Sequence, residues 1–218
     1  MIGPVTFIPI AEESGFIDEL GKFALDQATQ QIKLWQSQGL QTKVSVNLST
    51  RELLQDNLVA QIQETLYRHS VSTEFIEIEI TESSAMNDIE GSIDKLQSLR
   101  DLGIEVAIDD FGTSYSSLNY LKRLPATHLK IDRSFIKDLK KPDGSSSTDE
   151  AIVRAIVDLG HSLGFKIVAE GAETEDQWDY LASLGCDEIQ GYFYSPPVTA
   201  AKAAQLLKSQ QSAHKLIA

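Results

Sequence analysis

Two stretches of the sequence decide the fold: FIEIEITE at residues 75–82 and EVAIDDFG at residues 105–112. Each contains a short apolar run, rich in Val, Ile or Phe, that leads into acidic residues. A run of this length and composition predicts a buried β-strand. Carboxylates beside a buried strand need partners, because an unpaired buried charge costs several kcal/mol. The two stretches therefore predict strands that bring acidic groups to a common site.

The same pattern recurs along the chain and alternates with helical periodicity. The predicted strands are residues 44–48, 75–80, 105–111, 128–135, 166–169 and 188–194. The predicted helices between and after them are residues 51–67, 88–102, 148–163, 175–184 and 199–208. Before the first strand, the first forty residues are predicted to form one helical block that stops near Gly39. Strands that alternate with helices indicate parallel βαβ units.

Two α/β architectures can hold such units, an open doubly wound sheet and a TIM-like (β/α)8 barrel. The open sheet usually carries a Gly-rich phosphate loop after its first strand. Here the first strand ends in Asn47-Leu48-Ser49, without such a loop. A barrel instead takes functional residues from the carboxyl ends of many strands. The sequence favours the barrel, and only about six of its eight strands are visible.

Composition limits the classes of partner. The 218 residues suit one domain, with no second domain, and 19 basic against 32 acidic residues give a net charge of −13. Such a surface disfavours nucleic-acid polymers and anionic membranes. The single cysteine, Cys186, excludes a Cys-rich zinc site. We find neither a signal peptide nor a transmembrane stretch, so the expected location is cytoplasmic.

Polar residues at the strand ends are the candidate functional groups. Four of the six predicted strands carry an acidic residue or a lysine at or near the carboxyl end, and the first and sixth strands carry an Asn and a Gln there. The candidates are Asn47, Glu79, Glu82, Asp109, Asp110, Lys130, Asp132, Glu170, Glu173 and Gln190. Asp, Glu and Asn oxygens are ligands for hard cations such as Mg²⁺ or Mn²⁺. Two such ions could clamp the attacking and leaving oxygens of a phosphodiester.

These motifs resemble the EAL family, bacterial phosphodiesterases that hydrolyse the second messenger cyclic di-GMP. The matching segments follow the family's order over nearly the whole chain. They are residues 7–12 (FIPIAE), 46–49 (VNLS), 79–82 (EITE), 109–113 (DDFGT), 129–132 (LKID), 169–171 (AEG) and 190–192 (QGY). The resemblance implies an incomplete TIM-like barrel, two divalent ions, and cleavage of cyclic di-GMP to the linear dinucleotide pGpG.

The resemblance also implies a role for each strand-end residue. Asn47, Glu79 and Asp109 would bind the first metal ion, and Asp109 and Asp110, with Glu170, would serve the second. Lys130 would contact the nucleophilic water. Glu82 would anchor the loop after Asp109-Asp110, which in the family links catalysis to dimerisation, so a homodimer is expected. The remaining residues, Asp132, Glu173 and Gln190, would support the site.

One departure from the family pattern changes the expected activity. The family's Glu-x-Leu strand, which supplies another metal ligand, lies upstream of the segment that begins here at Thr6. The chain is therefore predicted to span residues 1–218 of an EAL-type domain without its first two strands, and its phosphodiesterase activity is expected to be impaired. The open sheet edges would be covered by another copy, by a rearranged amino-terminal segment or by an upstream region. The alternative function is a non-catalytic module that binds cyclic di-GMP or a protein.

Overall fold

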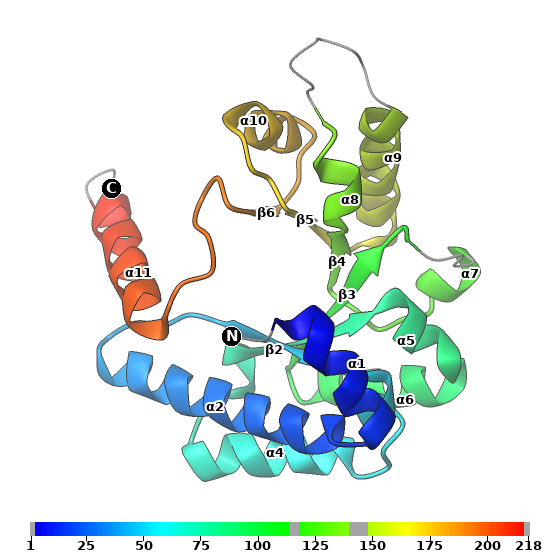
Figure 1. Ribbon diagram of the computed structural model, residues 1–218, viewed down its shortest axis with the longest axis vertical. Helices are drawn as coiled ribbons and strands as arrows, with labels where there is room; N and C mark the ends of the chain where they lie inside the picture. The colour runs from blue at the N-terminus through cyan, green and yellow to red at the C-terminus, as the bar shows by residue number, and fades with distance from the viewer. Residues whose placement is uncertain (1–2, 114–117, 140–147, 216–218) are drawn as a thin grey trace.

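A computed structural model describes residues 3–113, 118–139 and 148–215 (Figure 1). Its single sheet has six strands, all parallel, and follows the order of the chain from the first strand to the sixth. The strands are β1 (Val44–Leu48), β2 (Ile76–Thr81), β3 (Glu105–Phe111), β4 (His128–Ile131), β5 (Lys166–Glu170) and β6 (Glu188–Gln190).

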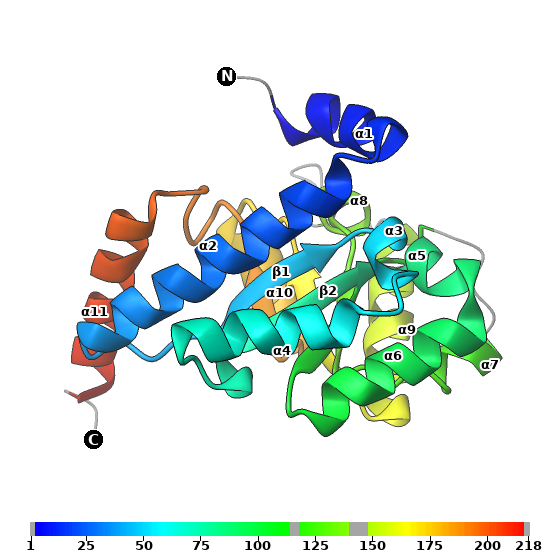
Figure 2. The ribbon, with the colours of Figure 1, turned by 90° about the horizontal axis from the view of Figure 1, so that it is seen from below.

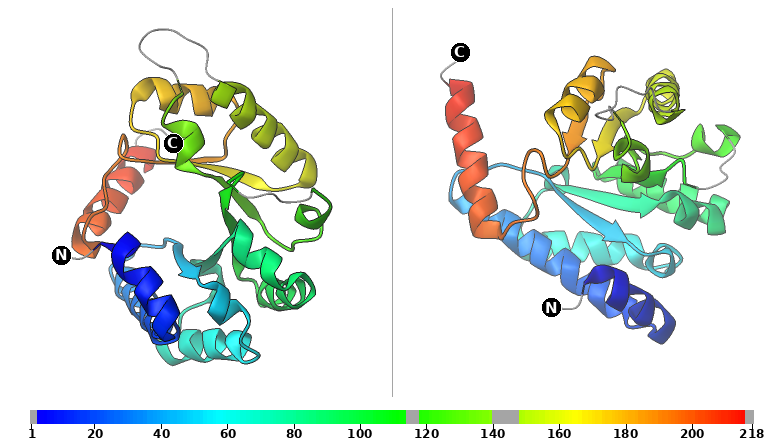
Figure 3. Two further views of the ribbon diagram at one scale, coloured as in Figure 1. Left: turned by 45° about the vertical axis from the view of Figure 1, so that its right-hand side comes forward. Right: turned by 45° about the horizontal axis from the view of Figure 1, so that its top comes forward.

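The sheet curls into a half-barrel whose first and last strands, β1 and β6, do not pair, and helices surround the curl (Figure 3). A strand order that never reverses is that of a barrel, because a doubly wound sheet changes direction at a switch point. The structure therefore confirms the predicted incomplete TIM-like barrel. In the described residues, β1 and β6 have one sheet neighbour each.

Helices connect the strands and cover the outside of the curl. The longer ones are α1 (Pro4–Ser14), α2 (Ile17–Ser37), α4 (Leu58–His69), α6 (Ile89–Asp101), α9 (Thr148–Leu163), α10 (Glu175–Ser183) and α11 (Ala200–Lys215). The shorter ones are α3 (Thr50–Leu53), α5 (Glu82–Asn87), α7 (Leu118–Leu121), α8 (Arg133–Ile136) and the 3₁₀ turn η1 (Thr73–Phe75). Within the described part of the chain, no helix combines the length and apolar composition that a membrane crossing requires.

Several predicted elements differ from the structure for local reasons. The first forty residues form two helices because Gly15, at φ 77°, ends α1, which projects away from the body (Figure 2). The helix predicted at residues 51–67 is two helices, of which α3 starts at a capping box between Ser49 and Glu52. The fourth strand ends at Ile131, since Asp132 caps the amino end of α8.

The two faces of the sheet differ in chemistry. Along β2, Ile76, Ile78 and Ile80 are buried in the main core beneath the helices. Alternate side chains of a strand point to opposite faces, so Glu77 and Glu79 lie on the concave face. Both glutamates are buried, and each contacts a cationic or imidazole side chain from β4. The interior of the curl is therefore polar.

Candidate functional site

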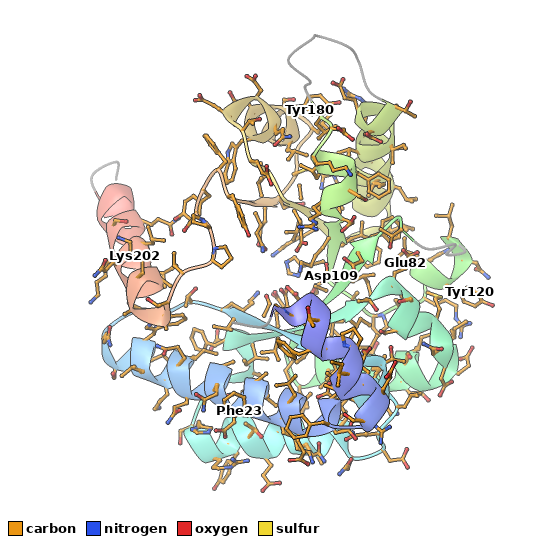
Figure 4. The ribbon with its side chains drawn as sticks, in the orientation of Figure 1. Phe23, Glu82, Asp109, Tyr120, Tyr180 and Lys202 are labelled. Carbon is orange, nitrogen blue, oxygen red and sulfur yellow. The ribbon has the colours of Figure 1, made fainter. Side chains whose placement is uncertain are left out.

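Lys130 lies at the centre of the site, at the carboxyl end of β4. Its Nζ is 2.6 Å from Glu170 Oε1, 2.8 Å from Glu79 Oε2 and 3.3 Å from Asp109 Oδ2. These carboxylates come from β5, β2 and β3, so four neighbouring strands meet at one ammonium group. Figure 4 shows Asp109 directed into the interior of the curl. The predicted convergence of the strand ends is present in the structure.

The charges of this cluster do not balance. Three carboxylates and one ammonium sum to −3 + 1 = −2 when all are ionised. Burial raises the pKa of Glu79 and of Glu170 above the ordinary value, and the neighbouring Asp109 adds to this effect although Lys130 opposes it. Burial alone would lower the pKa of Lys130, but Glu79, Glu170 and Asp109 outweigh it and raise that pKa. The cluster has the excess negative charge that a divalent cation would neutralise.

Asp109 and Asp110 sit in an irregular part of β3. The pairing register between β3 and β4 shifts between Ile108 and Phe111, and Asp110 has a φ of 55°. Asp tolerates this left-handed conformation better than most residues, and such outliers cluster at functional sites. The Asp110 amide donates to Asp109 Oδ1 at 2.9 Å. The bulge thus allows consecutive carboxylates to serve one site, although a regular strand would point them to opposite faces.

Asp132 extends the acidic cluster from the end of β4. Burial raises the pKa of Asp110, and so do the charges of Asp109 and Asp132 and a side-chain hydrogen bond with Asp132. Neighbouring carboxylates disfavour each other's ionised form unless a proton or a cation lies between them. One oxygen of Asp132 accepts a hydrogen bond from the Ser134 amide at 2.9 Å. The structure therefore brings Asp132 to the second part of the predicted metal site.

Glu82 holds the loop that follows β3. It is 2% exposed, and its Oε2 accepts a hydrogen bond from the Gly112 amide at 3.1 Å. Gly112 has a φ of 94°, and a Cβ there would come within 2.9 Å of the Phe135 ring. Figure 4 shows Glu82 on the loop side of Asp109. A buried carboxylate that accepts a hydrogen bond from the loop backbone is the arrangement needed to anchor the loop after β3.

The other predicted residues are exposed and lie at the rim. Asn47 is paired in register with Glu79 and is exposed at the end of β1. Gln190 is paired in register with Glu170, and its carbonyl accepts a hydrogen bond from the Gly171 amide at 2.7 Å. Glu173 is exposed, and its backbone amide donates to Gln177 Oε1 at 2.8 Å. Among the described residues, no side-chain hydrogen bond or ion pair joins these three residues to the Lys130 cluster.

An open cleft of about 960 Å³ adjoins the cluster. Glu170, Asp132, Glu173 and Gln190 all line it, so four predicted site residues share this space. The remaining walls come from α8, from the loop after β6 and from α11. The volume is within the range of small-molecule sites and suits a ligand larger than a mononucleotide.

A second polar cluster, which sequence reasoning missed, lies at the amino ends of the strands. One ligand atom each from Glu77, Glu105 and His128 lies within 4.8 Å of the others, so these residues could hold a metal ion. They are already paired, since His128 Nδ1 is 2.8 Å from Glu77 Oε2 and Lys43 pairs with Glu105. Burial would raise the pKa of Glu77, but hydrogen bonds from His128 and Ser45 outweigh it and lower that pKa. The alternation of Glu77 and Glu79 with apolar residues along β2 was the sequence pattern that could have indicated this second cluster.

The fold and the site define a class: an α/β half-barrel with a carboxylate–lysine cluster at the carboxyl ends of its strands. Residues 1–197 match the family described as the EAL domain. The chain belongs to the EAL domain family.

Relatives and solved structures agree with this assignment. The chain is 45% identical to a bifunctional diguanylate cyclase/cyclic di-GMP phosphodiesterase, MucR of Pseudomonas aeruginosa, over 96% of the chain and 30% of the relative. It is 39% identical to the signaling protein YkoW of Bacillus subtilis, over 96% of the chain and 26% of the relative. The chain thus spans under a third of these relatives.

Among solved structures, the MucR phosphodiesterase in complex with cyclic di-GMP aligns with a TM-score of 0.87 and 45% identity, covering 93% of the chain and 81% of that structure. The EAL domain of Mycobacterium smegmatis DcpA aligns with a TM-score of 0.81 and 36% identity, covering 88% of the chain and 85% of that domain. Both comparisons support the half-barrel fold.

Proposed function

We propose that this domain hydrolyses cyclic di-GMP to pGpG with the help of two divalent cations, Mg²⁺ or Mn²⁺. The observation that carries the proposal is the contact of Lys130 with Glu79, Asp109 and Glu170 beside an open cleft. Family membership and the names of relatives such as MucR supply the substrate. The proposed setting is bacterial second-messenger signalling in the cytoplasm.

The donor set fits two hard cations. Asn47, Glu79 and Asp109 would hold the first, and Asp109 and Asp110 with Glu170 would hold the second. All of these donors are oxygens, which Mg²⁺ and Mn²⁺ prefer. When bound, such a pair of ions would stabilise the charge on a phosphodiester under attack by water and lower the pKa of that water. Burial is the largest cause of the raised pKa values of Glu79, Asp110 and Glu170, and a bound cation would oppose it by favouring the ionised carboxylates.

The chain's own residues orient the reaction. Attack by water on one phosphorus breaks its bond to the 3′ oxygen, which takes a proton, and leaves a 5′ phosphate on the linear product. Lys130, buried and cationic, would position the water and offset the charge that develops on the phosphate oxygens. Glu82 would hold the loop after β3, and Asp132 would support Asp110. Glu173 and Gln190 would contact substrate at the cleft rim.

A second candidate function is a module that binds cyclic di-GMP without cutting it. The observation in its favour is that Lys130 already pairs with three of the carboxylates that a metal would use. A cationic lysine at that place reduces the charge available to attract an ion. The homodimer, the lack of a second domain and the impaired turnover of this chain stay predictions.

Release of pGpG decides between the two functions. We expect the purified chain to convert cyclic di-GMP to pGpG slowly with Mg²⁺ or Mn²⁺, because its turnover is predicted to be impaired, and to stop when EDTA removes the ion. Chromatography of the nucleotides measures the product, and calorimetry on the same sample measures binding. Binding of cyclic di-GMP without release of pGpG would contradict the phosphodiesterase function and support the binding module. If the chain neither binds cyclic di-GMP nor releases pGpG, both proposed functions are wrong.

A further inference from the structure

The cleft beside Glu170 has two cationic side chains that the proposed chemistry does not use. Arg133 begins α8, and Lys137 follows one turn later at the end of the same helix. Both are exposed, and neither forms a side-chain hydrogen bond or ion pair with another residue of the described ranges. The carboxylates that line the same cleft are Asp132, Glu170 and Glu173. Two unpaired cations facing a cleft of an acidic chain are available to a ligand.

The backbone places Arg133 directly beside the catalytic strand end. Gly171 follows Glu170 with a φ of 81°, and a Cβ built there would lie 2.6 Å from Arg133 Cβ. Only glycine lets α8 approach the end of β5 this closely. Gly171 is held from its other side by a hydrogen bond to the Gln190 carbonyl. The start of the Arg133 side chain is therefore fixed next to Glu170, while its guanidinium is free to reach into the cleft.

The same cleft offers an apolar surface for a flat ring. Tyr192, Pro196, Pro197 and Val198 line it, and Tyr192 is 62% exposed. The next two aromatic residues are engaged elsewhere, because Phe193 and Tyr194 pack against Trp178 at ring separations of 5.8 and 6.4 Å. An aromatic face beside unpaired donors is the combination that binds a nucleobase, by stacking and by hydrogen bonds to its edge.

We infer that Arg133, assisted by Lys137, binds the O6 and N7 acceptors of a guanine base that packs against Tyr192. The inference rests on the proposed function, in which the phosphate under attack lies at Lys130 and leaves a base to occupy the cleft. Arginine pairs with O6 and N7 of guanine through two donors. Adenine presents an amino donor in place of O6, so the same contact would discriminate cyclic di-GMP from cyclic di-AMP.

Calorimetry with EDTA present, which prevents turnover, tests this specificity. We expect Arg133→Ala to weaken binding of cyclic di-GMP by about 10- to 100-fold, the loss of one bidentate base contact. Arg133→Gln should shift the preference towards cyclic di-AMP, because glutamine pairs with adenine N6 and N7. Arg154→Ala is the matched control, since Arg154 is exposed on α9 and does not line the cleft. Thermal melts verify that each variant folds.

Three results would overturn the inference. One is unchanged cyclic di-GMP affinity in Arg133→Ala. The others are a shallower salt dependence of binding in that variant and an equal loss of affinity for cyclic di-AMP, since both indicate a phosphate contact. A wild-type chain that fails to bind cyclic di-GMP would overturn the proposed function as well, whereas binding that ignores Arg133 would overturn the guanine contact alone.

Discussion

Replacement of Lys130 by methionine is expected to lower the free energy of unfolding at pH 7 by about 3 kcal/mol without added metal. Methionine keeps most of the side-chain volume but removes the charge that Glu79, Asp109 and Glu170 share. Removing one partner of a buried ion pair costs about 3–5 kcal/mol, because the remaining charges stay buried and uncompensated. Urea unfolding of the two proteins in EDTA measures the difference.

The pH dependence of Lys130→Met has a definite sign. Burial already raises the pKa of Glu79 and Glu170, and loss of the ammonium would raise both pKa values further. The folded variant then binds more protons than its unfolded chain, so its stability rises as the pH falls from 7 towards 5. In the wild type, the raised pKa of Lys130 makes its contribution constant throughout this range and lost only above pH 10.5.

Lys202→Met is the control for this experiment. Lys202 is exposed on α11, away from the cluster (Figure 4), and its removal should change stability by less than about 0.5 kcal/mol. Adding Mn²⁺ should restore part of the stability of Lys130→Met, since a divalent ion can replace the missing charge. A Lys130→Met protein as stable as the control at pH 7 would show that the carboxylates do not depend on this lysine.

Asp109→Asn is expected to reduce pGpG release on the order of a thousandfold. Asp109 is the one residue proposed to contact both ions, and the amide that replaces it lacks the charge. Metal ions contribute several kcal/mol to transition-state stabilisation, and each 1.36 kcal/mol is a factor of ten in rate. Initial rates of pGpG formation at saturating Mg²⁺ give the ratio of kcat values.

Calorimetric titration with Mn²⁺ provides a second readout for Asp109→Asn. The variant should bind fewer or weaker Mn²⁺ ions than the wild type, whereas Asp94→Asn, an exposed carboxylate on α6, should match the wild type in both experiments. A variant that retains wild-type turnover would remove Asp109 from the chemistry. Loss of turnover with unchanged Mn²⁺ binding would assign Asp109 to substrate instead.

Much of the fold follows from local patterns. The apolar runs at residues 44–48 and 105–111 give strand bounds that agree with the structure, and the periodicity at residues 148–163 gives α9. Their alternation with helices implies parallel pairing, and the acidic strand ends imply a shared edge. The short helices α5 and α8 escaped this reasoning, because four to six residues carry too little periodicity to be recognised.

The sequence predicts which residues form the site but not how they contact one another. That Glu79, Asp109, Lys130 and Glu170 lie together follows from their places at strand ends. The bulge that turns Asp110 to φ 55° depends on the β3–β4 register, which no local pattern encodes. The role of Arg133 in lining the cleft depends on the approach of α8 to Gly171, a contact between segments far apart in the sequence.

The most direct test of the account locates bound Mn²⁺ in crystals by its anomalous scattering, with cyclic di-GMP present. We expect peaks at the carboxyl ends of the strands, within about 2.5 Å of oxygens of Asp109 and of Glu79 or Asp110. Peaks confined to Glu77, Glu105 and His128 at the other end of the sheet, or no peak at all, would contradict it.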